Sequence, residues 1–274
     1  MRTTNSFHAH HSPMGSHSSF TVGMFGANGG MALEKGSPAD QSIFLGYRSE
    51  SGLTKLFPFY ENLVNDAERF NQDDSKEETK TVEFSDSEIK RNYKWATDEF
   101  SAPGINFSIK TPFFSIPDPE SASKESLKKA SCPASFIEIS ISNDSDENWD
   151  GFFAIQGNTP WTPLSSRDGN LKGIMSRDEM GFASDDESIK EFIDFGIEQA
   201  LAGTHKTPNF LLGPIGGISF KVAPGAEKTV RIALGYFRDG DVVFNRSASY
   251  WYTQYFDSIE SVFSYALKHY DDFS

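Results

Sequence analysis

The sequence is poor in cysteine and has no long apolar run. Its single cysteine, Cys132, excludes an internal disulfide framework and favours a reducing compartment. No stretch approaches the roughly 18 consecutive apolar residues of a membrane helix, and the opening MRTTNSFHAHHSPMG lacks the apolar core of a secretory signal. We therefore expect a cytoplasmic protein with no membrane partner.

Positive charge is also scarce. Lys and Arg total 25 against 39 Asp and Glu, which gives a formal net charge of -14 that would repel a phosphate backbone. No basic stripe with interleaved aromatic residues is present, so nucleic acid is not an expected partner. The glycine-rich stretch at residues 23–30 lacks the lysine and the spacing of a phosphate-binding loop. It predicts a hairpin turn, and we expect no cofactor.

Alternating apolar and polar residues are abundant, and this pattern is typical of strands with one buried face. The alternation is clear at residues 105–109, 137–141 and 230–236. Pro224 and Gly225 precede the last of these runs and predict a tight connection between antiparallel strands. Aromatic residues make up 14% of the chain, including 25 Phe, which is enough to fill a large core.

We predict one domain over residues 1–274, mainly β, built as a large antiparallel β-sandwich (supersandwich-like) with a few short helices. Helical spacing occurs at 186–202 and at 257–271, where Asp257 is the expected N-cap. The second segment would be a C-terminal amphipathic helix, which needs a surface against which to bury its apolar face. Residues 61–90 are polar and charged and predict a solvated excursion from the sheet.

Histidine is concentrated near the start of the chain. The segment FHAHHSP contains His8, His10 and His11, and His17 follows shortly after. His8 and His10 would share one face of a strand and could ligate zinc, but the other histidines have no ligand-like spacing, so no metal is predicted. Two alternatives stay open: histidines hydrogen-bonded at the edge of a packed sheet, or imidazoles that contact sugar hydroxyls.

These residues also carry a resemblance to a known family. NSFHAHHSPMGSHSSFTVG followed by GGMALE resembles the opening of the family 52 glycoside hydrolases, which are β-xylosidases. YKWATDEFSAPGINFSIKTP, IPDPESASKESLKKASCPASFIEISISN, VAPGAEKTVRIALGYFRDG and SASYWYTQYFDSIESVFSYAL resemble successive parts of the same N-terminal domain. The resemblance runs from about Ser6 to the end of the chain and is loose over residues 160–215.

The resemblance implies a β-sandwich that packs on a following (α/α)6 catalytic barrel, in the same chain or in a separate one. Family members release xylose from the non-reducing ends of xylo-oligosaccharides with retention, which requires two carboxylates about 5 Å apart. In the family the nucleophilic Glu and the acid/base Asp lie in the barrel. We therefore expect this N-terminal domain to contain no catalytic residue and to be inactive alone. Its expected role is to support the barrel and to form one wall of the sugar pocket.

Five residues are candidates for contact with the sugar. His10 and His11 come first, followed by Thr97 and Asp98 in the ATD segment, with Arg167 last. Thr97 and Asp98 also have a simpler interpretation as a turn-capping pair, and Arg167 as a solvated charge.

The alternative function is a stand-alone carbohydrate-binding or structural β-sandwich without catalysis. Trp149, Trp161 and Trp251 offer flat apolar faces for a pyranose ring, although packing in the core or at an interface is the simpler interpretation of each. A sandwich without its barrel would leave an interdomain surface of about 600 to 1,500 Å² uncovered, so a homodimer is also expected.

Overall fold

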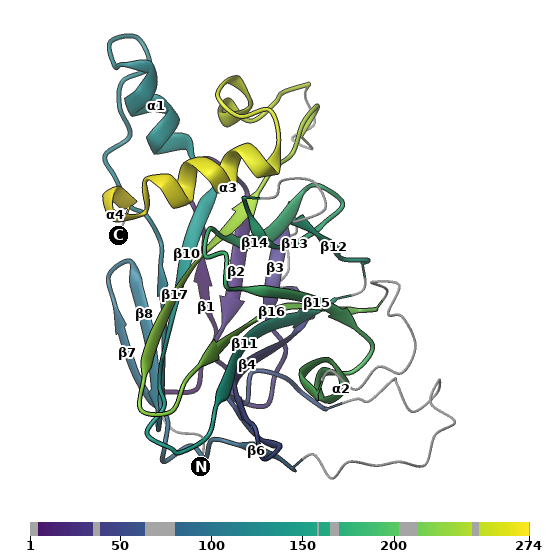
Figure 1. Ribbon diagram of the computed structural model, residues 1–274. Coiled ribbons are helices and arrows are strands. Elements are labelled where there is room, and N and C mark those ends of the chain that lie inside the picture. The colour runs from purple at the N-terminus through teal and green to yellow at the C-terminus, as the bar shows by residue number, and fades with distance from the viewer. Residues whose placement is uncertain are drawn as a thin grey trace.

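The computed structural model describes residues 5–34, 39–63, 80–157, 159–164, 170–202, 213–242 and 247–273. The strands in this part of the chain form three sheets, of three, eight and six strands. Apolar side chains from all three sheets meet in one shared core, with the two larger sheets forming the layers of a sandwich (Figure 1). The predicted mainly β, antiparallel sandwich is confirmed.

The largest sheet carries the strands that the sequence pattern indicates most clearly. Neighbouring strands are antiparallel throughout, and the long β10 and β17 pair at its centre. Its spatial order is β12 (Thr162–Pro163), β13 (Lys172–Ser176), β14 (Met180–Ser184), β17 (Glu227–Tyr236), β10 (Ala134–Ser142), β9 (Ile105–Lys110), β8 (Thr97–Ala102) and β7 (Lys90–Lys94).

The second large sheet has a parallel pair at one edge, β5 with β6, and is otherwise antiparallel. Its order is β15 (Lys190–Asp194), β16 (Ile215–Val222), β11 (Trp149–Gln156), β4 (Ser42–Ser49), β5 (Leu53–Leu56) and β6 (Lys80–Glu83).

A small sheet holds the histidine segment against the sandwich. It consists of β1 (Ala9–His11), β2 (Ser18–Val22) and β3 (Gly30–Leu33). The glycine-rich stretch 23–30 joins β2 to β3, which pair antiparallel, so the predicted hairpin is confirmed. Gly23 and Gly30 have φ values of 110° and 105°, which a side chain would strain.

The predicted alternation places its apolar residues in the core. Phe153 on β11 is fully buried, and its ring contacts those of Phe20, Phe107 and Phe182, which come from β2, β9 and β14. One residue of the six-stranded sheet thus touches both other sheets. The alternating positions that lie in this core are Ile105, Phe107, Ile109, Ile137, Ile139, Ile141, Val230, Ile232, Leu234 and Tyr236.

The longest described helix covers the face of the eight-stranded sheet that lies away from the shared core. The amphipathic α3 (Ile259–Lys268), yellow in Figure 1, packs on β17, β14 and β10. Its N-cap is Ser258, in a capping box with Ser261, so the predicted cap at Asp257 is off by one residue. No helix in the described ranges is long and apolar enough to cross a membrane. The remaining helices are α1 (Lys124–Ser131), α2 (Ile197–Ala202), α4 (Tyr270–Phe273) and the 3-10 helix η3 (Trp251–Gln254).

Three predicted segments differ from the structure. Within the helix predicted at 186–202, β15 is instead an edge strand, because pairing with β16 and burial of Ile193 outweigh the helical spacing. Only α2, at the end of the segment, is helical. The Pro224-Gly225 turn is tight but joins β16 to β17, which lie in different sheets. Within 61–90, residues 80–83 form strand β6, and 64–79 lie outside the described residues.

Candidate functional site

Three segments that are distant in the sequence meet around one pocket of about 250 Å³. Residues 10–12 of the histidine segment form one side, residues 93–97 of the β7–β8 hairpin form another, and residues 111–113 after β9 form the third. The small sheet is thereby held next to the edge of the eight-stranded sheet. Most of the predicted sugar-contact candidates belong to these segments.

The β7–β8 hairpin has the shortest kind of loop. Lys94 pairs with Thr97, so only Trp95 and Ala96 connect the strands. Ala96 has φ of 58°, a left-handed conformation that a non-glycine residue adopts at a cost. Its carbonyl accepts a hydrogen bond of 2.8 Å from the Thr111 backbone N–H. The loop is therefore fixed to the segment after β9, and Trp95 is held at the pocket wall.

A buried ion pair lies behind the pocket. Asp98 is completely buried, and its two carboxylate oxygens accept hydrogen bonds of 2.8 and 2.5 Å from Nε and Nη2 of Arg91. Burial alone would raise the pKa of Asp98, but the contacts with His11 and Arg91 outweigh it and hold that pKa below its ordinary value. Asp98 is thus a fixed negative charge. Its expected place in a turn is wrong, because it lies in strand β8.

Arg91 also ties down the start of the chain. Its Nη1 donates hydrogen bonds to the backbone carbonyls of Phe7 at 2.6 Å and of Asn5 at 3.2 Å. Its guanidinium carbon lies 3.8 Å from the ring centroid of Phe7 and 4.6 Å from that of Phe100. This single buried cation therefore positions the histidine segment beside the β7–β8 hairpin.

The two adjacent histidines face different partners. Nδ1 of the exposed His10 lies 2.7 Å from Thr21 Oγ1. His11 is buried, with Nδ1 3.2 Å from Thr111 Oγ1 and Nε2 3.4 Å from Asp98 Oδ2, longer than a normal hydrogen bond. His10 thus keeps Nε2 without a partner among the described residues, while His11 bridges the pocket wall and the ion pair.

His8 and His10 lie two residues apart at the start of the small sheet. His8 precedes β1 and is half-buried, and burial, followed by the charges of His10 and Arg91, lowers its pKa. Within the described ranges, no cluster of three or more His, Cys, Asp or Glu side chains could hold a metal ion.

Two exposed aromatic rings stand at the pocket rim. The Trp95 side chain is 78% exposed and that of Phe113 is 63% exposed, and their ring centroids lie 5.0 Å apart in an edge-to-face arrangement. Tyr93 also lines the pocket. Large aromatic side chains that stay exposed next to a pocket are more often found at interaction surfaces than elsewhere on a protein.

Comparison with known proteins identifies the family. The family model described as glycosyl hydrolase family 52 matches residues 20–274. The chain belongs to this family. It is also similar to two proteins named beta-xylosidase from Geobacillus stearothermophilus: 34% identical over 280 residues, covering 98% of this chain and 40% of the relative, and 31% identical over 288 residues, covering 97% and 46%. The family 52 chain therefore spans less than half the length of these relatives.

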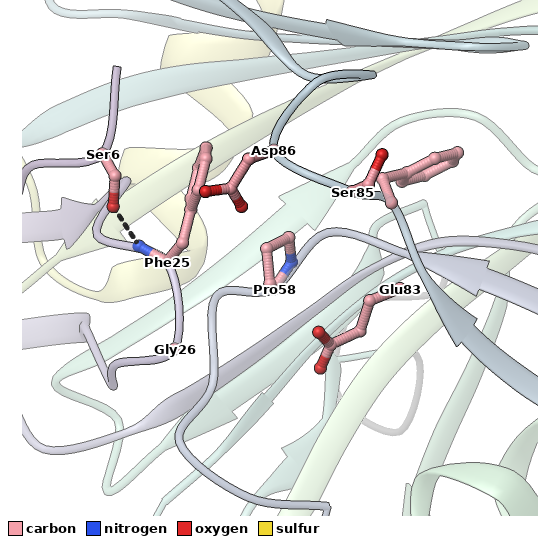
Figure 2. A pocket seen from close by; sticks show the side chains of 8 residues that line it. Ser6, Phe25, Gly26, Pro58, Glu83, Ser85 and Asp86 are labelled. Atoms are coloured by element: carbon pink, nitrogen blue, oxygen red, sulfur yellow. Dashed lines mark hydrogen bonds between the residues drawn. The ribbon is translucent and has the colours of Figure 1, made fainter. Parts of the chain in front are cut away.

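A second pocket of about 420 Å³ bears carboxylates (Figure 2). Glu83 accepts a 2.6 Å hydrogen bond from the Tyr60 hydroxyl, and Pro58 lies between Glu83 and Asp86 in the view of Figure 2. On the opposite wall Ser6 Oγ accepts a hydrogen bond from the Phe25 backbone N–H. Glu83 and Asp86 both line this second pocket of the family 52 chain, whereas no carboxylate belongs to the described residues that line the His10 pocket.

The structure brings most of the candidate sugar-contact residues together. His10, His11 and Thr97 line the first pocket, and Asp98 lies behind it. Arg167 lies outside the described residues. Trp149 stacks on Tyr47 and Trp161 donates its indole N–H to the Pro214 carbonyl, so both tryptophans are core residues, while Trp251 on η3 is about half exposed.

Sequence analysis missed two residues of the site. Arg91 gives no signal in the sequence, because its partner Asp98 is defined only by the pairing of β7 with β8. Trp95 does give a signal in the sequence. It lies between Lys94 and Ala96, outside any apolar alternation, where a core residue is not expected.

Proposed function

We propose that this chain is the β-sandwich domain of a retaining β-xylosidase, which supports an (α/α)6 catalytic domain and forms one wall of its sugar pocket. The observation that carries the proposal is the similarity over 98% of the chain to a protein named beta-xylosidase, of which it covers 40%. The substrate would be a xylo-oligosaccharide, and the catalytic domain would be part of the same or of a second chain.

The chemistry of the pocket supports a wall without bond-breaking groups. Retention needs one carboxylate as nucleophile and another as acid/base, about 5 Å apart. No carboxylate belongs to the described residues that line the His10 pocket. Asp98 is close by, but its bidentate pair with Arg91 and its lowered pKa make it a poor proton donor and a poor nucleophile. The catalytic groups would come from the other domain.

The rim of the pocket supports docking of that domain. Tyr93, Trp95 and Phe113 line the pocket and are exposed, with Trp95 against Phe113, and the exposed Phe7 extends this aromatic surface through its contact with Tyr93. A catalytic domain that closes over this rim would bury the apolar surface and enclose the sugar between the two domains. In the isolated chain the same surface would favour self-association, which keeps a homodimer among the expectations.

The proposal includes a cytoplasmic location. Cys132 is buried, and burial raises the pKa of its thiol, so it is an inert packing residue rather than half of a disulfide.

The test is hydrolysis of an aryl β-xyloside by the purified chain alone. We expect no turnover above that of a heat-denatured sample, because no carboxylate belongs to the described residues that line the His10 pocket and the catalytic pair would come from the other domain. Turnover that follows the chain through successive purification steps and disappears on heating would contradict the proposal.

A further inference from the structure

We propose that Trp95 and Phe113, together with His10, form a subsite for one pyranose ring of a xylo-oligosaccharide, which this chain binds without a catalytic domain. The choice of sugar rests on the function proposed above. The site itself rests on the geometry of the first pocket, where an open aromatic wall meets polar groups that carry no negative charge.

Trp95 has the position of a stacking platform. Its side chain is 78% exposed, although the two-residue loop that carries it is fixed by the Ala96–Thr111 backbone hydrogen bond. Phe113 meets Trp95 edge-to-face at 5.0 Å and restrains the indole. A rigid, uncovered indole binds a flat apolar face with little loss of conformational entropy, and the C–H face of a pyranose ring has this character.

The polar groups of the pocket suit the hydroxyls of the same ring. His10 uses Nδ1 on Thr21, which leaves Nε2 free of described partners at the pocket. Ser12 and Thr97 add hydroxyls that both donate and accept, and Lys94 adds a donor. A ligand with an apolar face and a hydroxyl edge matches this arrangement.

Size and charge narrow the ligand to a small neutral ring. A volume of about 250 Å³ is below the range for drug-sized ligands and suits a single sugar unit. No acidic residue lines the described walls, so the pocket has no counter-charge for a cation, and the net charge of -14 disfavours anionic polymers. A neutral sugar is the class that meets both conditions.

The test is calorimetric titration of the purified chain with xylotriose at millimolar concentrations. We expect saturable binding that Trp95→Ala weakens roughly tenfold, as for the loss of one stacking contact. Trp95→Phe should retain most of the affinity. Trp251→Ala is the matched control: it removes a half-exposed tryptophan remote in sequence from the pocket segments and should leave binding unchanged. Thermal unfolding checks that each variant folds, and Phe113→Ala provides a second variant at the site.

Three results would overturn the inference: no saturable binding by the wild-type chain, equal binding by wild type and Trp95→Ala, or equal binding of xylitol, which has the hydroxyls but no ring. These results leave the proposed function standing, because the hydrolysis assay depends on carboxylates and not on Trp95. Conversely, turnover by the chain alone would contradict the proposed function. The titration would still decide whether Trp95 binds the sugar.

Discussion

The interior between the sheets and the edge around the His10 pocket are built differently. In the interior, Phe153 is fully buried and contacts three phenylalanine rings, with the nearest centroid, that of Phe182, at 4.8 Å. At the edge, the Asp98 carboxylate has no exposed surface, whereas Trp95, three residues earlier in the chain, is 78% exposed. In the interior the aromatic rings around Phe153 are buried. At the edge the ion pair is buried and the aromatic rings are exposed.

This difference indicates what each region is for. Burial of apolar surface stabilises the fold, and the phenylalanine cluster around Phe153 follows that rule. An ion pair in a buried position and a left-handed alanine both cost stability, so residues that keep them serve another purpose. Under the proposed function, the ion pair and the left-handed alanine would hold the histidine segment and Trp95 in place for a sugar.

The largest effect should follow from truncation in the interior. Phe153→Ala removes a ring that joins the three sheets, and we expect the free energy of unfolding to fall by about 5 kcal/mol, near the upper end for a buried phenylalanine. Urea denaturation followed by circular dichroism measures this. A loss below about 1 kcal/mol would show that the interior is not tightly packed at this point.

The second effect concerns the ion pair at the edge. Asp98→Asn leaves the Arg91 guanidinium buried without a counter-charge, and we expect the free energy of unfolding at neutral pH to fall by about 3 kcal/mol. Urea denaturation again measures the change. The neighbouring exposed pair Asn92 and Glu99 offers a control, because Glu99→Gln on the same two strands should cost less than about 0.5 kcal/mol.

The pH dependence of that difference tests the lowered pKa of Asp98. A carboxyl whose pKa is lower in the folded than in the unfolded state stabilises the fold fully above the unfolded value of about 3.9 and loses this contribution as pH falls through the folded pKa. The difference between wild type and Asp98→Asn should therefore be constant from about pH 7 to 5 and narrow below about pH 4. A difference that narrows already between pH 7 and 6 would contradict the lowered pKa.

The smallest effect should be a gain in stability at the pocket. Ala96→Gly relieves the left-handed conformation, and we expect it to raise the free energy of unfolding by about 0.5 to 1 kcal/mol. Gly225→Ala is the reverse control, since Gly225 has φ of 66° in open space and should lose a similar amount. A loss of stability on Ala96→Gly would contradict backbone strain at Ala96.

The sequence predicts the interior far better than the edge. The alternation at residues 137–141 and 230–236 identifies buried strand faces, because a strand with one buried face must place apolar residues at every second position. The same reasoning fails at residues 190–194, which form an edge strand although the apolar residues of this segment have helical spacing. There the partner strand β16 decides the structure, and a local pattern contains no information about it.

The pocket was predictable only in part. His10 and His11 attract attention by their chemistry alone, and the family resemblance points to the same segment. That Asp98 contacts His11 could not be derived, because the two residues are 87 positions apart in the sequence and only the docking of the small sheet brings them together. Trp95 becomes a candidate once its exposure is known, and exposure is a property of the folded chain.

The most direct test of the account uses a chimera in which this chain replaces the matching segment of the Geobacillus stearothermophilus beta-xylosidase that is 34% identical to it. The quantity to measure is the KM for xylobiose, with the thermal midpoint recorded alongside. We predict that Trp95→Ala in the chimera raises KM several-fold while the midpoint stays within about 2 °C, as expected for an exposed residue that serves a ligand. An unchanged KM in an active chimera would contradict the claim that this edge forms a wall of the sugar pocket.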